Sequence, residues 1–134
     1  MRCMNKAALA FVLLAALSAS AADKLDPKPF DAMVDNALKG YNDGDSKVFF
    51  ADYAKIVAAI ATEQTFKTMY ADRYKKDYGD YVSRKMLDKN TVLMGDFPLL
   101  VYEAEFKNGK VKLSVNFTKE GDKFKIMQMA MDKL

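Results

Sequence analysis

The sequence predicts an α+β domain in which N-terminal helices precede an antiparallel sheet and pack on it. Two observations lead to this prediction, and a third marks where the domain begins. Apolar positions recur at spacings of three and four between residues 27 and 78, and apolar and polar positions alternate from residue 100 onward. Ahead of both, a short apolar run near the N-terminus ends in small residues. Helical periodicity followed by strand periodicity with hairpin turns is typical of α+β domains with the helices on one face of the sheet.

The first 21 residues have the parts of a secretory signal peptide. Basic residues precede an unbroken apolar run from 7 to 17, and small residues follow it. Ala19 and Ala21 suit an A-x-A cleavage site, which would leave residues 22–134 as one mature domain. The apolar run is shorter than the roughly 20 residues that a membrane-spanning helix needs. We therefore expect a periplasmic or secreted protein with no membrane anchor after cleavage.

The composition excludes several kinds of chemistry. The chain has no histidine, and its one cysteine, Cys3, lies ahead of the apolar run, where a lipoprotein cysteine does not stand. The mature chain therefore has no thiol nucleophile, no Ser-His-Asp triad and no zinc site built from imidazole or thiolate, and we expect no metal and no cofactor. The net charge of +3 includes Arg2 and Lys6 of the signal. The mature domain is then nearly neutral, which gives no reason to expect a nucleic-acid partner.

Three helices are expected in the first half of the mature chain. Asp26 suits the N-cap of the first and Pro27 its first turn, Asp45 suits the N-cap of the second, and the third runs from near Thr62 to Gly79. The three apolar stripes consist of Phe30, Met33, Val34, Ala37, Leu38 and Tyr41, then Phe49, Phe50, Tyr53, Ile56, Val57 and Ile60, then Phe66, Met69, Tyr70, Tyr74 and Tyr78.

Strands follow, with a short one expected over 81–87 and a longer one from Leu100 to Phe106. Asn108-Gly109 is a strong signal for a two-residue type I′ hairpin turn. With that turn, residues whose numbers add to 217 pair, so that Phe106 faces Val111, Ala104 faces Leu113, Tyr102 faces Val115, Leu100 faces Phe117 and Glu105 faces Lys112. All of these pairs except the last are apolar on both sides.

The second hairpin turn is expected at residues 119–122, with Thr118 opposite Lys123. This register places Met127, Met129 and Met131 on the face of the sheet away from the helices. Exposed apolar strips usually mark contacts, so we expect these methionines to form an interface, and a homodimer is the partner that this interface suggests. The alternative is that a loop or the C-terminal tail covers them.

The order of these elements resembles a known superfamily. Three helices lead into a meander, the stretch 38–45 (Leu-Lys-Gly-Tyr-Asn-Asp-Gly-Asp) precedes an aromatic second helix, and hairpins close at 106–109 and 117–122. This pattern, over most of 27–134, is similar to the nuclear transport factor 2-like, or cystatin-like, superfamily, and within it to small secreted bacterial members of unknown function. The resemblance implies a cone-shaped domain with a curved sheet and a cavity between helices and sheet, often dimeric. Relatives use this fold for ligand binding, catalysis or assembly.

Two functions remain open for such a cavity. Tyr41 and Tyr102 are the residues that we expect to face it and bind a ligand, although both also suit a core position with a satisfied hydroxyl. Some relatives run isomerase or dehydratase chemistry with a buried aspartate and a tyrosine, but Glu103 and Glu105 point away from the apolar face, and no catalytic residue is predicted.

We therefore expect a non-enzymatic module for binding a small apolar ligand or for assembly. The alternative is a lyase or isomerase acting on a small apolar substrate in the cone. A carboxylate in an enclosed cavity would favour the enzyme, and an apolar cavity without convergent polar groups would favour the binding module.

Overall fold

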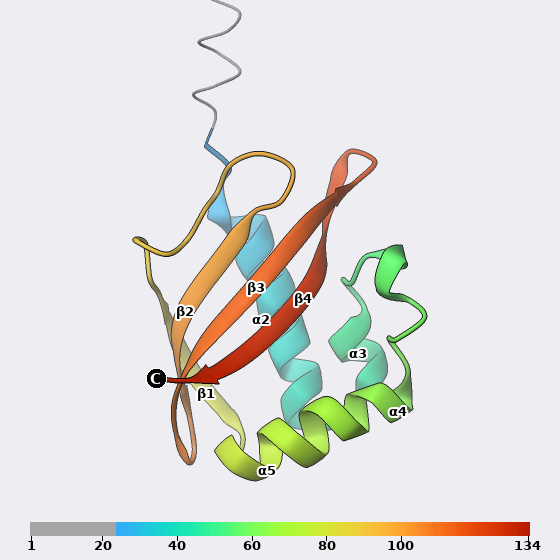
Figure 1. Ribbon diagram of the computed structural model, residues 1–134, viewed down its shortest axis with the longest axis vertical. Helices are drawn as coiled ribbons and strands as arrows, with labels where there is room; N and C mark the ends of the chain where they lie inside the picture. Colours follow the sequence, from blue (N-terminus) through green and yellow to red (C-terminus); the bar gives the residue numbers. More distant parts are fainter. Residues whose placement is uncertain (1–23) are drawn as a thin grey trace, which may run out of the picture.

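The computed structural model describes residues 24–134, and in them helices precede a four-stranded antiparallel sheet (Figure 1). The α+β class is therefore confirmed, whereas the predicted signal over 1–21 lies outside the described residues. The elements are the helices α2 (Pro27–Asp43), α3 (Ser46–Phe50), η1 (Lys55–Val57), α4 (Glu63–Thr65), η2 (Phe66–Tyr74) and α5 (Lys75–Tyr78), and the strands β1 (Tyr81–Met86), β2 (Leu99–Phe106), β3 (Gly109–Glu120) and β4 (Lys123–Lys133).

The predicted helix starts are confirmed by their side-chain caps. The Asp26 carboxylate accepts a hydrogen bond of 3.1 Å from the backbone N–H of Lys28 at the start of α2. The Asp45 carboxylate accepts hydrogen bonds from two backbone N–H groups in the first turn of α3. These carboxylates satisfy backbone donors that have no partner inside a helix. Between the two helices, Gly44 has a φ of 68° and ends α2.

The second helix is much shorter than predicted, because the chain leaves it to pair with the sheet. Tyr53 forms a parallel bridge with Ile126 of β4. The Ala54 N–H donates to the Ile126 carbonyl at 2.9 Å, and the Ile126 N–H donates to the carbonyl of Asp52 at 2.8 Å. The prediction of a buried helical stripe through Ile56 and Ile60 is therefore wrong, and these side chains are 73% and 58% exposed.

The third helix begins and ends as predicted but contains a π-helical segment. Thr62 caps its start, and Gly79, with a φ of 77°, follows its end. Phe66, Tyr70, Tyr74 and Tyr78 are spaced four apart along η2 and α5 and form a ladder on one face, with ring centroids 6.2, 5.6 and 6.3 Å apart. Met69 is 42% exposed, so its predicted place in the buried stripe is wrong.

The sheet has the strand order β1-β2-β3-β4, so β1 and β4 are its edges. In Figure 1, α2 runs behind the sheet and the segment from α4 to α5 passes beneath its lower end. The core lies between these helices and the inner face of the sheet. Its most completely buried large side chains are Leu38, Tyr41, Phe49, Leu100, Tyr102, Phe106, Leu113, Phe117 and Ile126.

The first hairpin is paired two residues away from the predicted register. Phe106 pairs with Gly109, so the turn consists of Lys107 and Asn108 rather than Asn108 and Gly109. Two tertiary hydrogen bonds hold this turn, from the Lys107 N–H to the Asp80 carbonyl and from the Asn108 N–H to the Tyr78 carbonyl, both 2.9 Å long. A shift of two residues keeps every side chain on its predicted face, so the apolar face is unchanged.

The second hairpin also shifts, and a β-bulge follows it. Phe117 pairs with Ile126 and Asn116 pairs with Gln128, which leaves Met127 as an extra residue without a partner in β3. One extra residue exchanges the two faces of the strand beyond it. Met129 and Met131 therefore point into the core and are 2% and 3% exposed.

The predicted interface through the methionines is wrong in its geometry. Only Met127, at the bulge, stays partly exposed, so Met127, Met129 and Met131 do not form one exposed strip. Because Met129 and Met131 are buried in the core, their apolar side chains require neither an interface nor the alternative, a loop or tail that covers the outer face. Self-association of the domain stays a prediction, without this strip as its basis.

The bulge predicts different costs at two adjacent positions. Met129→Lys is expected to lower the free energy of unfolding by more than about 3 kcal/mol, because it places an unpaired charge in the core. Gln128→Lys, on the exposed side of the same strand, is expected to change it by less than about 0.5 kcal/mol. Urea denaturation measures both values. A Met129→Lys protein as stable as the wild type would mean that the bulge is misplaced and the methionine strip is exposed.

Candidate functional site

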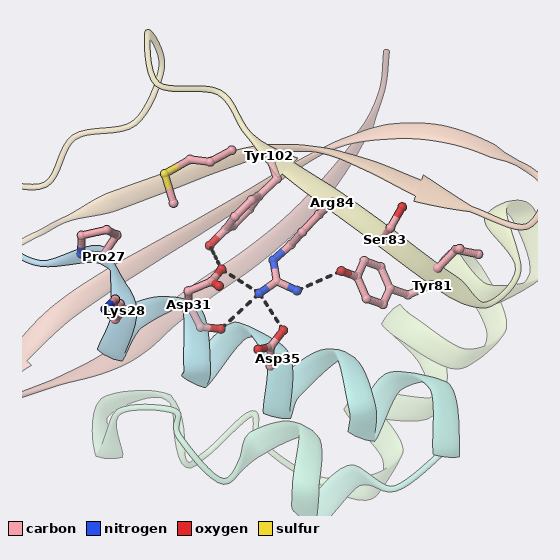
Figure 2. Close-up of a pocket in the computed structure, with 10 residues that line it drawn as sticks. Pro27, Lys28, Asp31, Asp35, Tyr81, Ser83, Arg84 and Tyr102 are labelled. Carbon is pink, nitrogen blue, oxygen red and sulfur yellow. Dashed lines mark hydrogen bonds and ion pairs between the residues drawn. The ribbon is translucent and has the colours of Figure 1, made fainter.

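A groove of about 510 Å³ lies where the edge strand β1 faces helix α2 (Figure 2). Its floor and walls combine aromatic, charged and apolar side chains. The residues that line it are Pro27, Lys28, Asp31 and Asp35 of α2, Tyr81, Val82, Ser83, Arg84 and Met86 of β1, and Tyr102 of β2. The groove therefore joins segments that are about half the chain apart in sequence.

Arg84 points inward because of a second β-bulge. Tyr81 pairs with Phe106 and Ser83 with Glu105, so Val82 is the extra residue in β1. Beyond it, Arg84 pairs with Ala104 and shares the inner face of the sheet. Its side chain is 8% exposed, which is unusual for an arginine and requires partners for its charge.

Two carboxylates of α2 and one hydroxyl of β1 supply these partners. Arg84 Nη2 lies 2.7 Å from Asp31 Oδ1 and 2.7 Å from Asp35 Oδ1, and Nη1 donates to the Tyr81 hydroxyl at 2.9 Å. Nη2 also donates to the Asp31 carbonyl at 3.2 Å. Burial opposes the charged form, but the hydrogen bonds that Arg84 donates to Asp31, Asp35 and Tyr81 outweigh it and raise the pKa of Arg84. The guanidinium thus remains a cation and links β1 to α2 through its ion pairs with Asp31 and Asp35.

Tyr102 belongs to the same cluster. Its hydroxyl donates to Asp31 Oδ1 at 2.8 Å, and its ring centre lies 5.0 Å from the guanidinium carbon of Arg84. Burial raises the pKa of Tyr102 above its ordinary value, and the hydrogen bond and negative charge of Asp31 raise it further. One carboxylate oxygen of Asp31 therefore accepts from a cation and a neutral phenol together.

The charges of the groove differ in how far they reach solvent. The side chain of Asp31 is 44% exposed and that of Asp35 is 66% exposed, whereas the Arg84 cation lies beneath them. Lys28 adds an exposed positive charge one turn earlier in α2. The middle of the groove therefore presents carboxylates, and Arg84 Nε is buried there without a hydrogen-bond partner in the described residues.

A second cavity, of about 310 Å³, lies at the opposite edge of the sheet, between η2 and β4. Aromatic, methionine and aliphatic side chains make most of its wall. Its lining consists of Phe50, Tyr53, Val57, Ile60, Thr65, Met69, Tyr70, Tyr74, Met127, Gln128, Met129 and Ala130. No acidic or basic residue is among them, so this apolar pocket has no group suited to proton transfer near neutral pH.

Two tyrosines that line the apolar pocket, Tyr53 and Tyr70, have buried hydroxyls. The Tyr70 hydroxyl donates to the Met129 carbonyl at 3.2 Å, whereas the Tyr53 hydroxyl is buried and has no partner with hydrogen-bonding geometry in residues 24–134. Burial raises the pKa of Tyr53, and the nearby Tyr70 hydroxyl adds to the effect. Burial also raises the pKa of Tyr70. Both hydroxyls are therefore neutral, and the O–H of Tyr53 is a donor without an acceptor in the described residues.

The structure separates the two tyrosines that were predicted to bind a ligand. Tyr102 lines the groove, but Tyr41 lies in the core, is 1% exposed and donates its hydroxyl to the Gly79 carbonyl at 2.8 Å. Burial and the nearby charge of Asp80 raise the pKa of Tyr41. The structure supports the core interpretation for Tyr41, because its hydroxyl is already satisfied by the backbone.

The most polar residues of the groove were missed by the sequence analysis. Asp31 and Asp35 lie on a helix, and the alternation that shows which strand residues face the core gives no information about them. Arg84 carries a weak signal, since it falls on the same alternation as Met86 in a short strand. Within the described part of the chain, no group of three or more acidic, histidine or cysteine residues is arranged to hold a metal ion. The same residues include no helix long and apolar enough to cross a membrane.

Comparisons with known proteins extend to the fold alone. No family model matches the sequence, and no curated protein is significantly similar to it. The crystal structure of a DUF4783 family protein from Bacteroides uniformis is similar with a TM-score of 0.51 and 13% identity, over 75% of this chain and 95% of that chain. Bd1075 of Bdellovibrio bacteriovorus has a TM-score of 0.50 and 12% identity, over 80% of this chain; this chain covers 40% of Bd1075.

The cluster predicts unequal contributions from its two carboxylates. Asp31→Asn is expected to lower the free energy of unfolding by about 2 kcal/mol, because both Arg84 and Tyr102 lose a charged acceptor. Asp35→Asn is expected to cost less than about 1 kcal/mol, since it loses one contact at a mostly exposed position. Urea denaturation compares the two. Equal losses would show that the bond between Asp31 and Tyr102 contributes nothing to stability.

Proposed function

We propose that the protein is an exported, non-enzymatic binding module that takes a small apolar ligand into the pocket between η2 and β4. The observation that carries this proposal is the lining of that pocket, which is apolar and aromatic and contains no charged residue. Ligand pockets are typically apolar with a few polar groups, over roughly 300 to 1,000 Å³. The pocket is at the lower end of this range, which favours a small ligand.

The rim and the wall of the pocket support the same function. Ile60 and Met69 line the pocket and keep 58% and 42% of their surface exposed, although each could have been replaced by a polar residue at no cost to the core. A ligand that enters would cover them. Tyr53 also lines the pocket, and its hydroxyl is buried without a partner in residues 24–134, so a shift of this side chain would let it donate to one acceptor on the ligand, such as a carbonyl or ether oxygen.

The alternative of a lyase or isomerase has less support. Its best candidate acid is Asp31, which contacts Tyr102 as in some acid–base sites. A carboxyl acts in this way in an enclosed apolar site. Asp31 lies in an open groove, pairs with the Arg84 cation and is 44% exposed. The apolar pocket, which has the right surroundings, has no carboxylate.

Export is part of the proposal and is supported by the sequence. The basic start, the apolar run over 7–17 and the small residues before Ala22 suit a cleaved signal, and a periplasmic or secreted domain follows from it. We also propose that the fold is the cystatin-like one, because three helical segments precede a four-stranded meander. The exported chain is then expected to begin at or next to Ala22 when its mass is measured.

Titration with N-phenyl-1-naphthylamine, a small apolar fluorescent probe, tests the binding function. The purified protein is expected to raise the fluorescence saturably at one probe per chain. Ile60→Glu is expected to weaken binding about tenfold, because it places a charge at the rim of the pocket. The matched control is Met94→Glu, since Met94 is 52% exposed against 58% for Ile60 and lies in the loop before β2, away from the pocket.

Thermal melts of the two variants establish that both are folded as the wild type is. Non-saturable fluorescence, or equal affinities of Ile60→Glu and Met94→Glu, would contradict the proposal. In that case the apolar pocket is a packing defect and not a binding site.

A further inference from the structure

We propose that the open edge of β1 and the groove beside it bind an extended peptide by strand addition, and that the peptide carries a lysine or arginine toward Asp35. This site is independent of the apolar pocket, which lies at the other edge of the sheet. In strand addition, a peptide pairs its backbone with the free edge of a sheet, and adjacent pockets read its side chains. Three features of the β1 edge carry the inference.

The first feature is a set of free backbone groups. The Leu87 N–H donates to the Val101 carbonyl of β2 at 2.8 Å. Because backbone groups alternate between the two sides of an antiparallel strand, those of Lys85 also point to β2, whereas those of Arg84 and Met86 point to the open edge. No residue between 24 and 134 forms a hydrogen bond with the backbone N–H or C=O of Arg84 or Met86 at that edge.

The second feature is a side-chain amide that already occupies the same edge. Asn42 Nδ2 donates to the Tyr81 carbonyl at 3.0 Å, and the Tyr81 N–H donates to Asn42 Oδ1 at 2.8 Å. The Asn42 amide thus offers one donor and one acceptor to Tyr81, as the backbone of an added strand would. The edge therefore already pairs with an amide group at Tyr81. Further along the same edge, the backbone groups of Arg84 and Met86 have no such partner in the described residues.

The third feature is the groove that an added strand would cover. It holds about 510 Å³ between β1 and α2, and Figure 2 shows Asp31 and Asp35 rising from α2 toward the strand. The Arg84 cation is 8% exposed, so the charges that a bound peptide meets are the carboxylates, at 44% and 66% exposure, and Lys28 one turn away. Charge complementarity therefore favours a basic side chain next to Asp35 over an acidic one.

A phage library of random heptapeptides, selected on the immobilised protein, supplies the probe. The best peptide is synthesised with blocked ends, and fluorescence anisotropy measures its dissociation constant. Two further forms are N-methylated at alternate residues, in the two possible registers. One register removes the N–H groups that face β1, and binding is expected to weaken at least about tenfold; the other faces solvent and is expected to change binding by less than about twofold.

The charge is tested on both partners. Replacing the basic residue of the peptide by norleucine is expected to weaken binding about fivefold, and so is Asp35→Asn in the protein. The control is Asp43→Asn, because Asp43 lies on the same helix at 57% exposure but pairs with Lys39 outside the groove.

Several results would overturn the inference. These are a library that yields no binding peptide, equal effects of the two N-methylated registers, and equal affinities of the Asp35→Asn and Asp43→Asn proteins. A wild-type protein that sedimentation equilibrium shows to be dimeric, and that loses peptide binding as it dimerises, would assign the edge to a second copy of the chain. None of these results depends on probe binding in the apolar pocket, so either site can be contradicted without contradicting the other.

Discussion

A four-stranded open sheet has two edges, and each exposes backbone N–H and C=O groups that need partners. In this protein, the two edges have different hydrogen-bond partners. Near its middle, the β4 edge is bonded by the segment Asp52–Ala54, which pairs with the backbone N–H and C=O of Ile126, and by the Tyr70 hydroxyl, which donates to the Met129 carbonyl. At the β1 edge, Asn42 covers Tyr81 alone. The bonded part of the β4 edge lies beside the apolar pocket, and the open part of the β1 edge lies beside the groove.

The two β-bulges lie in these edge strands and decide which side chains each site receives. At Met127 the bulge turns Met129 into the core and leaves Met127 in the wall of the apolar pocket. At Val82 the bulge turns Arg84 beneath α2, where Asp31 and Tyr102 hold its charge. Bulges are common at sheet edges and beside functional sites because they redirect a side chain without ending the strand. Here the bulge in β4 places Met127 in the wall of the apolar pocket, and the bulge in β1 places Arg84 in the groove.

The features predicted well from the sequence are those that depend on neighbouring residues. The caps at Asp26 and Asp45 and the inner face of the first hairpin follow from short-range pattern alone. The register did not, because the hairpin turn at Lys107 is held by the carbonyl of Asp80, a tertiary contact. Nor did the site, because Arg84 meets Asp31 and Asp35 across about fifty residues of chain, and no local pattern reveals which helix face a strand residue will contact.

The central claim is that the β1 edge is open at Arg84 and Met86, whereas the β4 edge is bonded at Ile126. Residue-resolved amide hydrogen exchange of the free protein, followed by NMR, tests it most directly. The account predicts fast exchange at Arg84 and Met86, and slow exchange at Leu87, which bonds to β2, and at Ile126, which bonds to Asp52. Protection of Arg84 and Met86 equal to that of Ile126 would contradict it, since their N–H groups would then have partners.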